Sequence, residues 1–200
     1  MTNNSKNNCR CPWLDQSKSD YVEYHDQEWG VPVYGDQKIF EFLILESAQA
    51  GLSWYSILKR RQGYQAAFEN FDVHKVASYD QNNVEALMLN SSIIRNRGKI
   101  NAAINNAKLF IDIQQEFGSF SDYMWGFVNN KTIVNEYTEL SDYPTTSTES
   151  DAWSKDLKKR GFKFVGSTMC YAHMQACGMV NGHSLNCYKR KQIILKYQQI

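Results

Sequence analysis

Apolar residues recur at helical spacing along most of the chain, and few stretches alternate between apolar and polar residues as strands do. The pattern predicts a long amphipathic helix within 93–117, which a basic turn precedes and Gly118 ends. Segment 129–148 is rich in β-branched and turn residues, so we expect a long loop with some extended structure there. Other helices are predicted at 36–48, 54–68, 73–79, 84–89, 121–128, 152–160 and 168–180. The predicted fold is therefore all-α.

Polar residues in front of these apolar runs predict where several helices begin. Asp36 and Ser53 can each accept hydrogen bonds from the free N–H groups of a first helical turn. Asn82 or Asn83 is expected to begin a shorter helix, and the residues TESD at 148–151 match a loose capping signal.

The length of 200 residues suits one domain, or two small lobes, with a sizeable core. We expect a flexible tail at 1–8, a single domain of two helical lobes at 9–188, and a basic C-terminal tail at 189–200. The polar N-terminus does not resemble a signal peptide, and the stretch 165–188, although uncharged, is too polar to span a membrane. We therefore expect a cytoplasmic protein whose five cysteines stay reduced, which favours burial or metal binding over disulfides.

Charge is distributed unevenly, although the net charge is only +1. Eight Lys and Arg residues but no Asp or Glu follow Asp156, so that part carries +8 and the rest of the chain −7. Such one-sided charge is typical of proteins that bind a polyanion. For Lys189 to Lys196, however, a solvated basic tail is a better explanation than binding.

Glu46 is the only charged residue between Phe42 and Trp54. An ionised carboxylate in such apolar surroundings is costly unless it is paired. Upstream, Tyr21 and Tyr24 would share one face of a helix. An acid among aromatic rings can bind a flat, electron-poor ring, and the alternative is a satisfied carboxylate in an aromatic core.

The segment KKRGFKFVGST at 158–168 predicts two helices joined by a tight turn that Gly161 and Gly166 bound. The second helix would offer free N–H groups to a phosphate. The pattern resembles the helix-hairpin-helix element, which grips a DNA backbone without reading its sequence. Positive charge is supplied around it by Lys158, Lys159, Arg160 and Lys163.

A second basic turn contains Arg95, Arg97 and Lys99 around Gly98. It could hold a neighbouring phosphate, or it could be an ordinary solvated helix start.

Cysteine and histidine residues near the two ends of the chain could form one metal site. His183 and Cys187 are spaced to ligate one ion, and Cys11 with His25 would complete a Cys2His2 set, the composition of a closed structural zinc site. Four protein ligands leave no position for a catalytic water, so we expect the zinc to clip the two ends together. The alternative is that the cysteines are small buried hydrophobes.

Five motifs follow one another along the chain: YVEYHDQEWGVP, LESAQAGLSW, IIRNRGKI, KKRGFKFVG and QACGMVNGH. Together they closely resemble the bacterial 3-methyladenine DNA glycosylase I family, over about Cys11 to Cys187. The resemblance implies the helix-hairpin-helix DNA glycosylase fold. It also implies a base-excision-repair enzyme that flips 3-methyladenine out of double-stranded DNA and releases it by hydrolysis, leaving an abasic site.

The same resemblance implies roles for individual residues. Glu46 would accept hydrogen bonds from the flipped base, Tyr24 and Trp54 would stack on it, and Tyr21 would help to line the pocket. Leu52, beside Gly51, is the candidate for the wedge that fills the gap in the duplex. The expected contacts to the DNA backbone are Arg95, Arg97, Lys99, Gly161, Lys163 and Gly166.

The four zinc ligands implied by the family are Cys11, His25, His183 and Cys187. Cys9 also lies near the N-terminal ligand position, and only the Cys-x-Trp context favours Cys11.

A 3-methylated adenine in DNA is positively charged and leaves its sugar readily, so the main task is to choose it from normal adenine. Flipping costs a few kcal/mol, less for a damaged base. A cationic ring between Tyr24 and Trp54 would gain about 0.5–2 kcal/mol, and Glu46 would add a charge-assisted hydrogen bond. No acid follows the hairpin and no lysine lies beside the pocket motifs, so we expect a monofunctional enzyme in which Glu46 acts mainly in recognition. We also expect the protein to be a monomer.

Three other interpretations are open. The chain could be a DNA-binding module without a working pocket, or a metal-dependent hydrolase that uses His25, His183 and a cysteine. It could also be a glycosylase of the same fold with another lesion preference.

Overall fold

The structure is a computed structural model that describes residues 9–197, and the chain forms two compact units. The first unit comprises residues 9–32, 131–144 and 174–197, and the second comprises 33–130 and 145–173. The predicted flexible tail at 1–8 lies outside the described residues.

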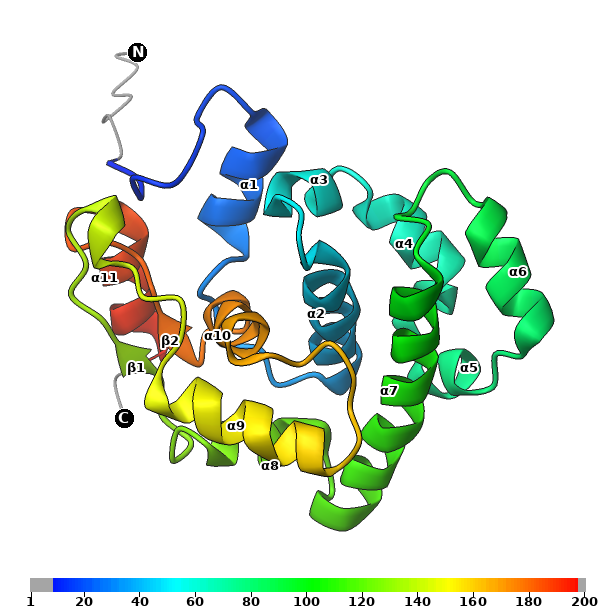
Figure 1. The fold of residues 1–200 in the computed structure, drawn as a ribbon. Coiled ribbons are helices and arrows are strands. Elements are labelled where there is room, and N and C mark those ends of the chain that lie inside the picture. The colour runs from blue at the N-terminus through cyan, green and yellow to red at the C-terminus, as the bar shows by residue number, and fades with distance from the viewer. Residues whose placement is uncertain (1–8, 198–200) are drawn as a thin grey trace. The chain divides into compact units, whose positions relative to one another are not determined.

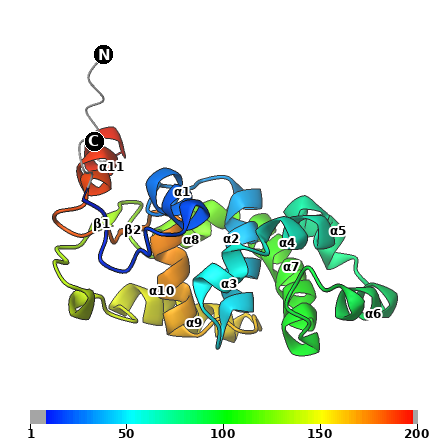
Figure 2. The same cartoon turned by 90° about the horizontal axis from the view of Figure 1, so that it is seen from above.

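The second unit consists of helices, as the periodicity predicts, and Figures 1 and 2 show α5 and α6 beside the long helix α7. The last helix, α10 (Ser167–Ala176), begins in this unit and ends in the first. The other elements are α2 (Asp36–Gln49), α3 (Trp54–Leu58), α4 (Arg61–Ala67), η1 (Glu69–Phe71), α5 (Val73–Ala77), α6 (Gln81–Leu89), α7 (Arg97–Phe117), α8 (Phe120–Gly126) and α9 (Thr148–Lys159).

Aromatic side chains from three helices form the core of this unit. Phe110 from α7 and Phe120 from α8 stack with ring centroids 3.9 Å apart, and Phe40 from α2 meets Phe110 edge-on. All three are fully buried, and burying one such side chain contributes about 1.5–3 kcal/mol. This packing fixes α2, which carries Glu46, against α7.

Helix ends only partly follow the predicted caps. Ser53 caps α3 and Gly118 ends α7, as predicted. The prediction that Asp36 caps its own helix is wrong, because Gly35 precedes α2 and the Asp36 carboxylate instead accepts hydrogen bonds from the first N–H groups of α8, those of Phe120 and Ser121, at 2.9 Å each.

Two other helix starts lie a residue or more from their predicted positions. Asp80, not Asn82 or Asn83, caps α6 and forms a capping box with Asn83. Ser147 caps α9 one residue before the predicted signal, in a capping box with Ser150. In each case the true cap is a short polar residue just upstream.

The first unit contains α1 (Ser19–Gln27), η2 (Leu140–Asp142) and α11 (Tyr188–Tyr197). The segment predicted to be extended contributes β1 (Ile133–Val134), which pairs in parallel with β2 (Val180–Asn181). Much of the expected basic tail is helical in α11, which buries Ile193. Among the described helices, none has both the length and the apolar character needed to cross a membrane.

Candidate active site and metal cluster

Glu46 lies near the end of α2, and its side chain is only 5% exposed. Within residues 9–197, no side chain or backbone group gives it a hydrogen bond or an ion pair. Burial raises the pKa of the Glu46 carboxyl to about 8. The carboxyl is therefore mostly protonated at pH 7 in the free protein. A cation bound beside it would stabilise the carboxylate and lower this pKa.

The Glu46 pocket, a cavity of about 390 Å³ in the second unit, lies beside this carboxyl. Its volume falls in the range of small-molecule sites. One wall comes from the end of α2 and the following turn, and the other from the α9–α10 connection and α10 itself. The lining residues are Glu46, Gln49, Ala50, Gly51, Leu52, Phe164, Gly166, Thr168, Met169 and Ala172.

The turn after α2 brings Leu52 to the edge of this pocket. Gly51 adopts φ +79°, a left-handed conformation that a residue with Cβ rarely adopts. The Leu52 N–H donates to the Gln49 carbonyl at 2.6 Å, and the Leu52 side chain is 42% exposed. Of the residues predicted from the motif LESAQAGLSW, the structure thus brings Glu46, Gly51 and Leu52 to one pocket.

Lys99 holds this turn from α7. Its ammonium donates to the Ala48 carbonyl at 2.8 Å and to the Ala50 carbonyl at 2.6 Å, and burial lowers its pKa. A cation on the last carbonyls of a helix complements the negative end of the helix dipole. The Lys99 side chain therefore fixes the end of α2.

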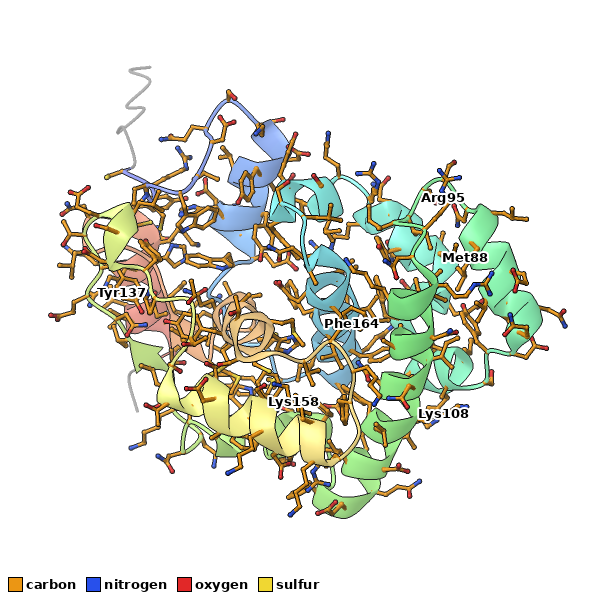
Figure 3. All side chains as sticks on the ribbon, in the orientation of Figure 1. Met88, Arg95, Lys108, Tyr137, Lys158 and Phe164 are labelled. Carbon is orange, nitrogen blue, oxygen red and sulfur yellow. The ribbon has the colours of Figure 1, made fainter. Side chains whose placement is uncertain are left out.

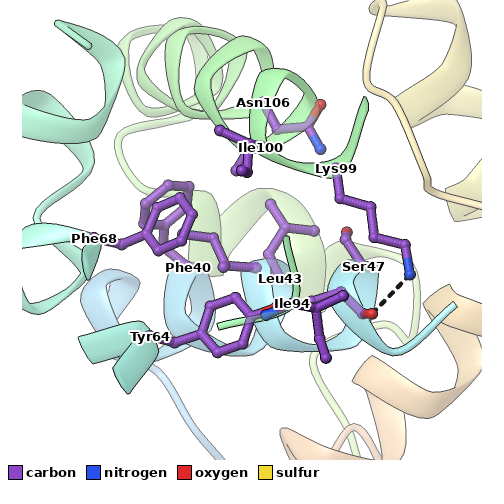
Figure 4. Close-up of a pocket in the computed structure, with 12 residues that line it drawn as sticks. Phe40, Leu43, Ser47, Tyr64, Phe68, Ile94, Lys99, Ile100 and Asn106 are labelled. Atoms are coloured by element: carbon purple, nitrogen blue, oxygen red, sulfur yellow. Dashed lines mark hydrogen bonds between the residues drawn. The ribbon is translucent and has the colours of Figure 1, made fainter. Parts of the chain in front are cut away.

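A second cavity in the same unit lies between α2 and α7 and is shown with the Lys99 hydrogen bond in Figure 4. Its volume of about 20 Å³ suits a single water molecule. Most of its lining is apolar, including Leu43 and Phe68. A nucleobase does not fit there, so the Glu46 pocket is the candidate site.

The α9–α10 connection, predicted as a hairpin bounded by Gly161 and Gly166, is anchored by two asparagines of α7. Asn106 is 2% exposed; its amide nitrogen donates to the Lys163 carbonyl at 2.9 Å, and its oxygen accepts from the Lys163 N–H at 2.8 Å. Asn105 donates to the Gly161 carbonyl at 3.1 Å. Sequence analysis missed both residues, and the available signal was a pair of amides inside an otherwise amphipathic helix.

Some of the predicted basic residues form ion pairs within the protein, and others are exposed without one. Arg97 forms a two-pronged ion pair with Glu85, and Arg160 binds Glu116 and Asp156. The Arg160 guanidinium also lies over the rings of Phe117 and Tyr123, 5.2 Å from each centroid. In the described part of the chain, Arg95, Lys158, Lys159 and Lys163 are exposed and form no ion pair.

The predicted stacking residues lie in different parts of the chain. Trp54 is the first residue of α3 in the second unit and does not line the Glu46 pocket described above. Tyr21 and Tyr24 belong to α1 in the first unit, where their rings stack with centroids 6.4 Å apart. Their contact with a base stays a prediction.

Within the first unit, Cys11, His25, His183 and Cys187 form one buried cluster with all four ligand atoms within 4.8 Å of one another. The His183 Nδ1 lies 3.4 Å from each of the two sulfurs, and the His25 Nε2 lies 3.6 Å from the Cys187 Sγ. Cys9 is exposed, and its Sγ contacts the Arg10 carbonyl instead.

The outer nitrogen of each histidine is held by an acceptor. The His183 Nε2 donates to the Trp29 carbonyl at 2.9 Å, and the His25 Nδ1 binds Asp26 at 2.8 Å. Burial opposes ionisation of Asp26, but hydrogen bonds from Arg10 and His25 hold its pKa at about 2. Each imidazole therefore presents an unprotonated nitrogen to the cluster.

Three of the separations among these donor atoms match those around a tetrahedral zinc ion, and all four atoms lie within 4.8 Å of one another. Bonds of about 2.0–2.3 Å to nitrogen and sulfur imply ligand atoms about 3.3–3.8 Å apart, and the separations between histidine nitrogens and sulfurs are 3.4–3.6 Å. Trp29, from the aromatic motif, packs its ring on His183 with centroids 4.7 Å apart. Part of that motif therefore surrounds the metal cluster.

The chain resembles proteins of one family along nearly its whole length. The profile of the methyladenine glycosylase family matches residues 13–191. The DNA-3-methyladenine glycosylase 1 of Escherichia coli is 50% identical over 178 residues, which cover 89% of this chain and 95% of that protein.

Solved structures agree with this likeness. A crystal structure of 3-methyladenine DNA glycosylase I has a TM-score of 0.87 at 47% identity, covering 90% of this chain and 98% of that one. A structure of the Staphylococcus aureus enzyme that addresses 3-methyladenine recognition has a TM-score of 0.87 at 36% identity, covering 90% and 96%.

Proposed function

Because the chain belongs to the methyladenine glycosylase family, we propose that its Glu46 pocket receives the flipped base. The protein is a base-excision-repair glycosylase that releases 3-methyladenine from alkylated DNA and leaves an abasic site. The observation that supports the pocket assignment is a buried carboxyl without a partner in the described residues, beside a cavity of suitable volume.

Glu46 discriminates through its own ionisation. A neutral carboxyl is tolerated in the pocket, whereas a carboxylate there is costly unless a positive group compensates it. A 3-methylated adenine in DNA supplies that charge together with an exocyclic N–H donor, and normal adenine supplies no charge. The lesion therefore forms a charge-assisted hydrogen bond with Glu46 that adenine does not form.

The hydrolysis needs little further help, because the cationic base is a good leaving group. Among the residues that line the Glu46 pocket, Glu46 is the only acid and there is no lysine. Support for a monofunctional enzyme comes from this absence in the described pocket, since strand cleavage begins with an amine nucleophile.

DNA is held outside the pocket by the α9–α10 connection, which we assign as a helix-hairpin-helix element. Its backbone is anchored by Asn106, and Lys163 is exposed beside it. Arg95, in the other basic turn, is also exposed and has no ion pair in the described residues. Leu52 would fill the gap that the flipped nucleotide leaves in the duplex.

One zinc ion is proposed for the cluster of Cys11, His25, His183 and Cys187. The spacing of the donor atoms and the unprotonated ring nitrogens of the two histidines support it. When bound, zinc supplies a cross-link between segments far apart in the sequence, and all four positions belong to the protein. A monomeric state and a cytoplasmic location remain predictions.

The test compares Glu46→Gln with wild type in release of 3-methyladenine from methylated duplex DNA and in binding to an abasic duplex. A hydrogen bond to a charged group contributes about 1.5–3 kcal/mol, so we expect release to fall by about 10–150-fold. Binding to the abasic duplex should stay within about twofold, since Glu46 faces the pocket rather than the backbone.

Glu136→Gln, which changes an exposed glutamate of the first unit, is the matched control and should leave both measurements unchanged. Unchanged release by Glu46→Gln would show that the carboxylate does not take part in recognition. Release of other alkylated purines at similar rates would favour a glycosylase of broader lesion preference.

A further inference from the structure

Phe164 has two unusual properties for a large apolar residue. Its backbone adopts φ +56°, the left-handed region that bulky residues rarely occupy, and its side chain is 42% exposed. Figure 3 labels it on the connection between α9 and α10. Strained positions of this kind persist only where the surrounding structure imposes them, and they gather at functional sites.

Both neighbours of Phe164 are fixed. Lys163 is held by Asn106 through its N–H and its carbonyl, at 2.8 and 2.9 Å. On the other side, Val165 is 2% exposed, and its carbonyl accepts a hydrogen bond from Ser154 at 2.6 Å. The buried partners therefore hold the backbone in its strained conformation and leave the ring outside the core.

The ring lies between two hollows of the second unit. It lines the Glu46 pocket, which Leu52 also lines. It also lines an open hollow of about 420 Å³ on α7, beside Gly98 and Lys163. A methyl group added at Gly98 would lie 3.8 Å from the Phe164 Cζ, so the tip of the ring reaches the first turn of α7.

We propose that Phe164 is a second apolar DNA-contacting residue, whose ring packs on a base that remains in the duplex beside the flipped nucleotide. The proposal rests on the proposed function, because it takes the Glu46 pocket as the place of the flipped base. Aromatic faces stack on any base without reading its identity. Lys163, the preceding residue, is exposed and can accompany the ring with a contact to phosphate.

The position of Phe164 does not fit two other roles, that of a core residue and that of a residue that only lines the base pocket. A ring needed for the core would be buried, as Phe162 is at 3% exposed in the same connection. A ring that only lined the base pocket would not also border the hollow beside Gly98. Phe164 therefore lies at the opening of the Glu46 pocket rather than at its bottom.

The test uses Phe164→Asn, since asparagine tolerates left-handed φ and removes the ring, and Phe164→Tyr, which keeps the ring. Each protein is titrated with an abasic duplex that carries 2-aminopurine beside the abasic position. At about 1–3 kcal/mol per stacked base, we expect Phe164→Asn to bind about 5–150-fold more weakly and to change the 2-aminopurine fluorescence. Phe164→Tyr should behave like wild type.

Two further measurements separate this role from others. The melting temperature of Phe164→Asn should equal or exceed that of wild type, because the strained aromatic residue is gone and no buried contact is lost. Binding of free 3-methyladenine should be unchanged. The matched control is Leu89→Asn, at an apolar residue that is 82% exposed in the same unit, and it should alter nothing.

Unchanged duplex binding by Phe164→Asn would overturn the proposal, and so would an equal loss of binding to free 3-methyladenine, which would place the ring in the base pocket. A lower melting temperature together with weaker binding would make the residue structural and would also overturn it. Failure of the proposed function would look different, since wild type itself would then release no 3-methyladenine from methylated DNA.

Discussion

The buried carboxyl of Glu46 predicts an unusual dependence of stability on pH. Its pKa rises from the ordinary 4.5 to about 8 in the folded protein because burial disfavours the charged form. Between these two values the folded state binds more protons than the unfolded state. The free energy of unfolding contributed by Glu46 therefore falls as pH rises from about 4.5 to about 8, and no loss occurs below that window.

The size of the effect follows from the same two values. At 1.36 kcal/mol per pKa unit, the difference between 4.5 and about 8 amounts to about 5 kcal/mol. This is an upper limit, because water can enter the open pocket and solvate the carboxylate once it forms. Glu46→Gln keeps a neutral polar group of the same size and cannot ionise. The variant should match wild type near pH 4.5 and become increasingly more stable above it.

Equilibrium unfolding in urea at a series of pH values between 5 and 9, followed by the fluorescence of the five tryptophans, measures this difference directly. Other titrating groups are common to both proteins and cancel in the comparison. Glu136→Gln serves as the control, since its exposed carboxyl should give a curve parallel to wild type. Parallel curves for Glu46→Gln as well would mean that Glu46 is solvated and does not discriminate lesions through its ionisation.

Four further predictions test the pocket, the metal cluster and the basic residues. The kcat/KM for 3-methyladenine release should rise with pH through about 8, as Glu46 loses its proton in the free enzyme, and a flat profile would contradict this role. Protein purified without added metal should contain about one zinc per chain; Cys11→Ser should lower zinc content and melting temperature, whereas the exposed Cys9→Ser should change neither. Lys163→Ala should reduce by about one the slope of log binding constant against log salt concentration. Lys99→Met should instead lower stability and leave that slope unchanged, because its ammonium is bound to carbonyls; a reduced slope would identify Lys99 as a phosphate ligand.

Helix positions followed well from the sequence because their signals are local. The predicted segment 93–117 contains α7, and Gly118 ends it with φ +90°. The family was also predicted correctly, since five ordered motifs span nearly the region that the family profile matches, residues 13–191. Periodicity and the order of motifs are properties of the linear sequence, so they can be recognised without knowledge of the tertiary structure.

Side chains that act at a distance were predicted less well. Asp36 has the position of an N-cap, but its carboxylate serves α8, 84 residues further along at Phe120. Asn106 reaches Lys163 across a separation of 57 residues. A short polar side chain carries the same local signal whether its partner is near or far. Only the packing of α7 against its neighbours decides which partner it meets.

The basic residues show the same limit in their electrostatics. Sequence analysis grouped Arg97 and Lys99 with Arg95, yet an ion pair occupies Arg97 and two carbonyls occupy Lys99. A cation that already has a partner inside the protein must give it up to meet a phosphate, so it gains little from DNA. Exposed cations without such a partner gain the full benefit of counterion release. Among the predicted backbone contacts in the described part of the second unit, Arg95 and Lys163 are therefore the stronger phosphate ligands, one from each basic turn. A count of positive charges overstates the number of DNA contacts for the same reason.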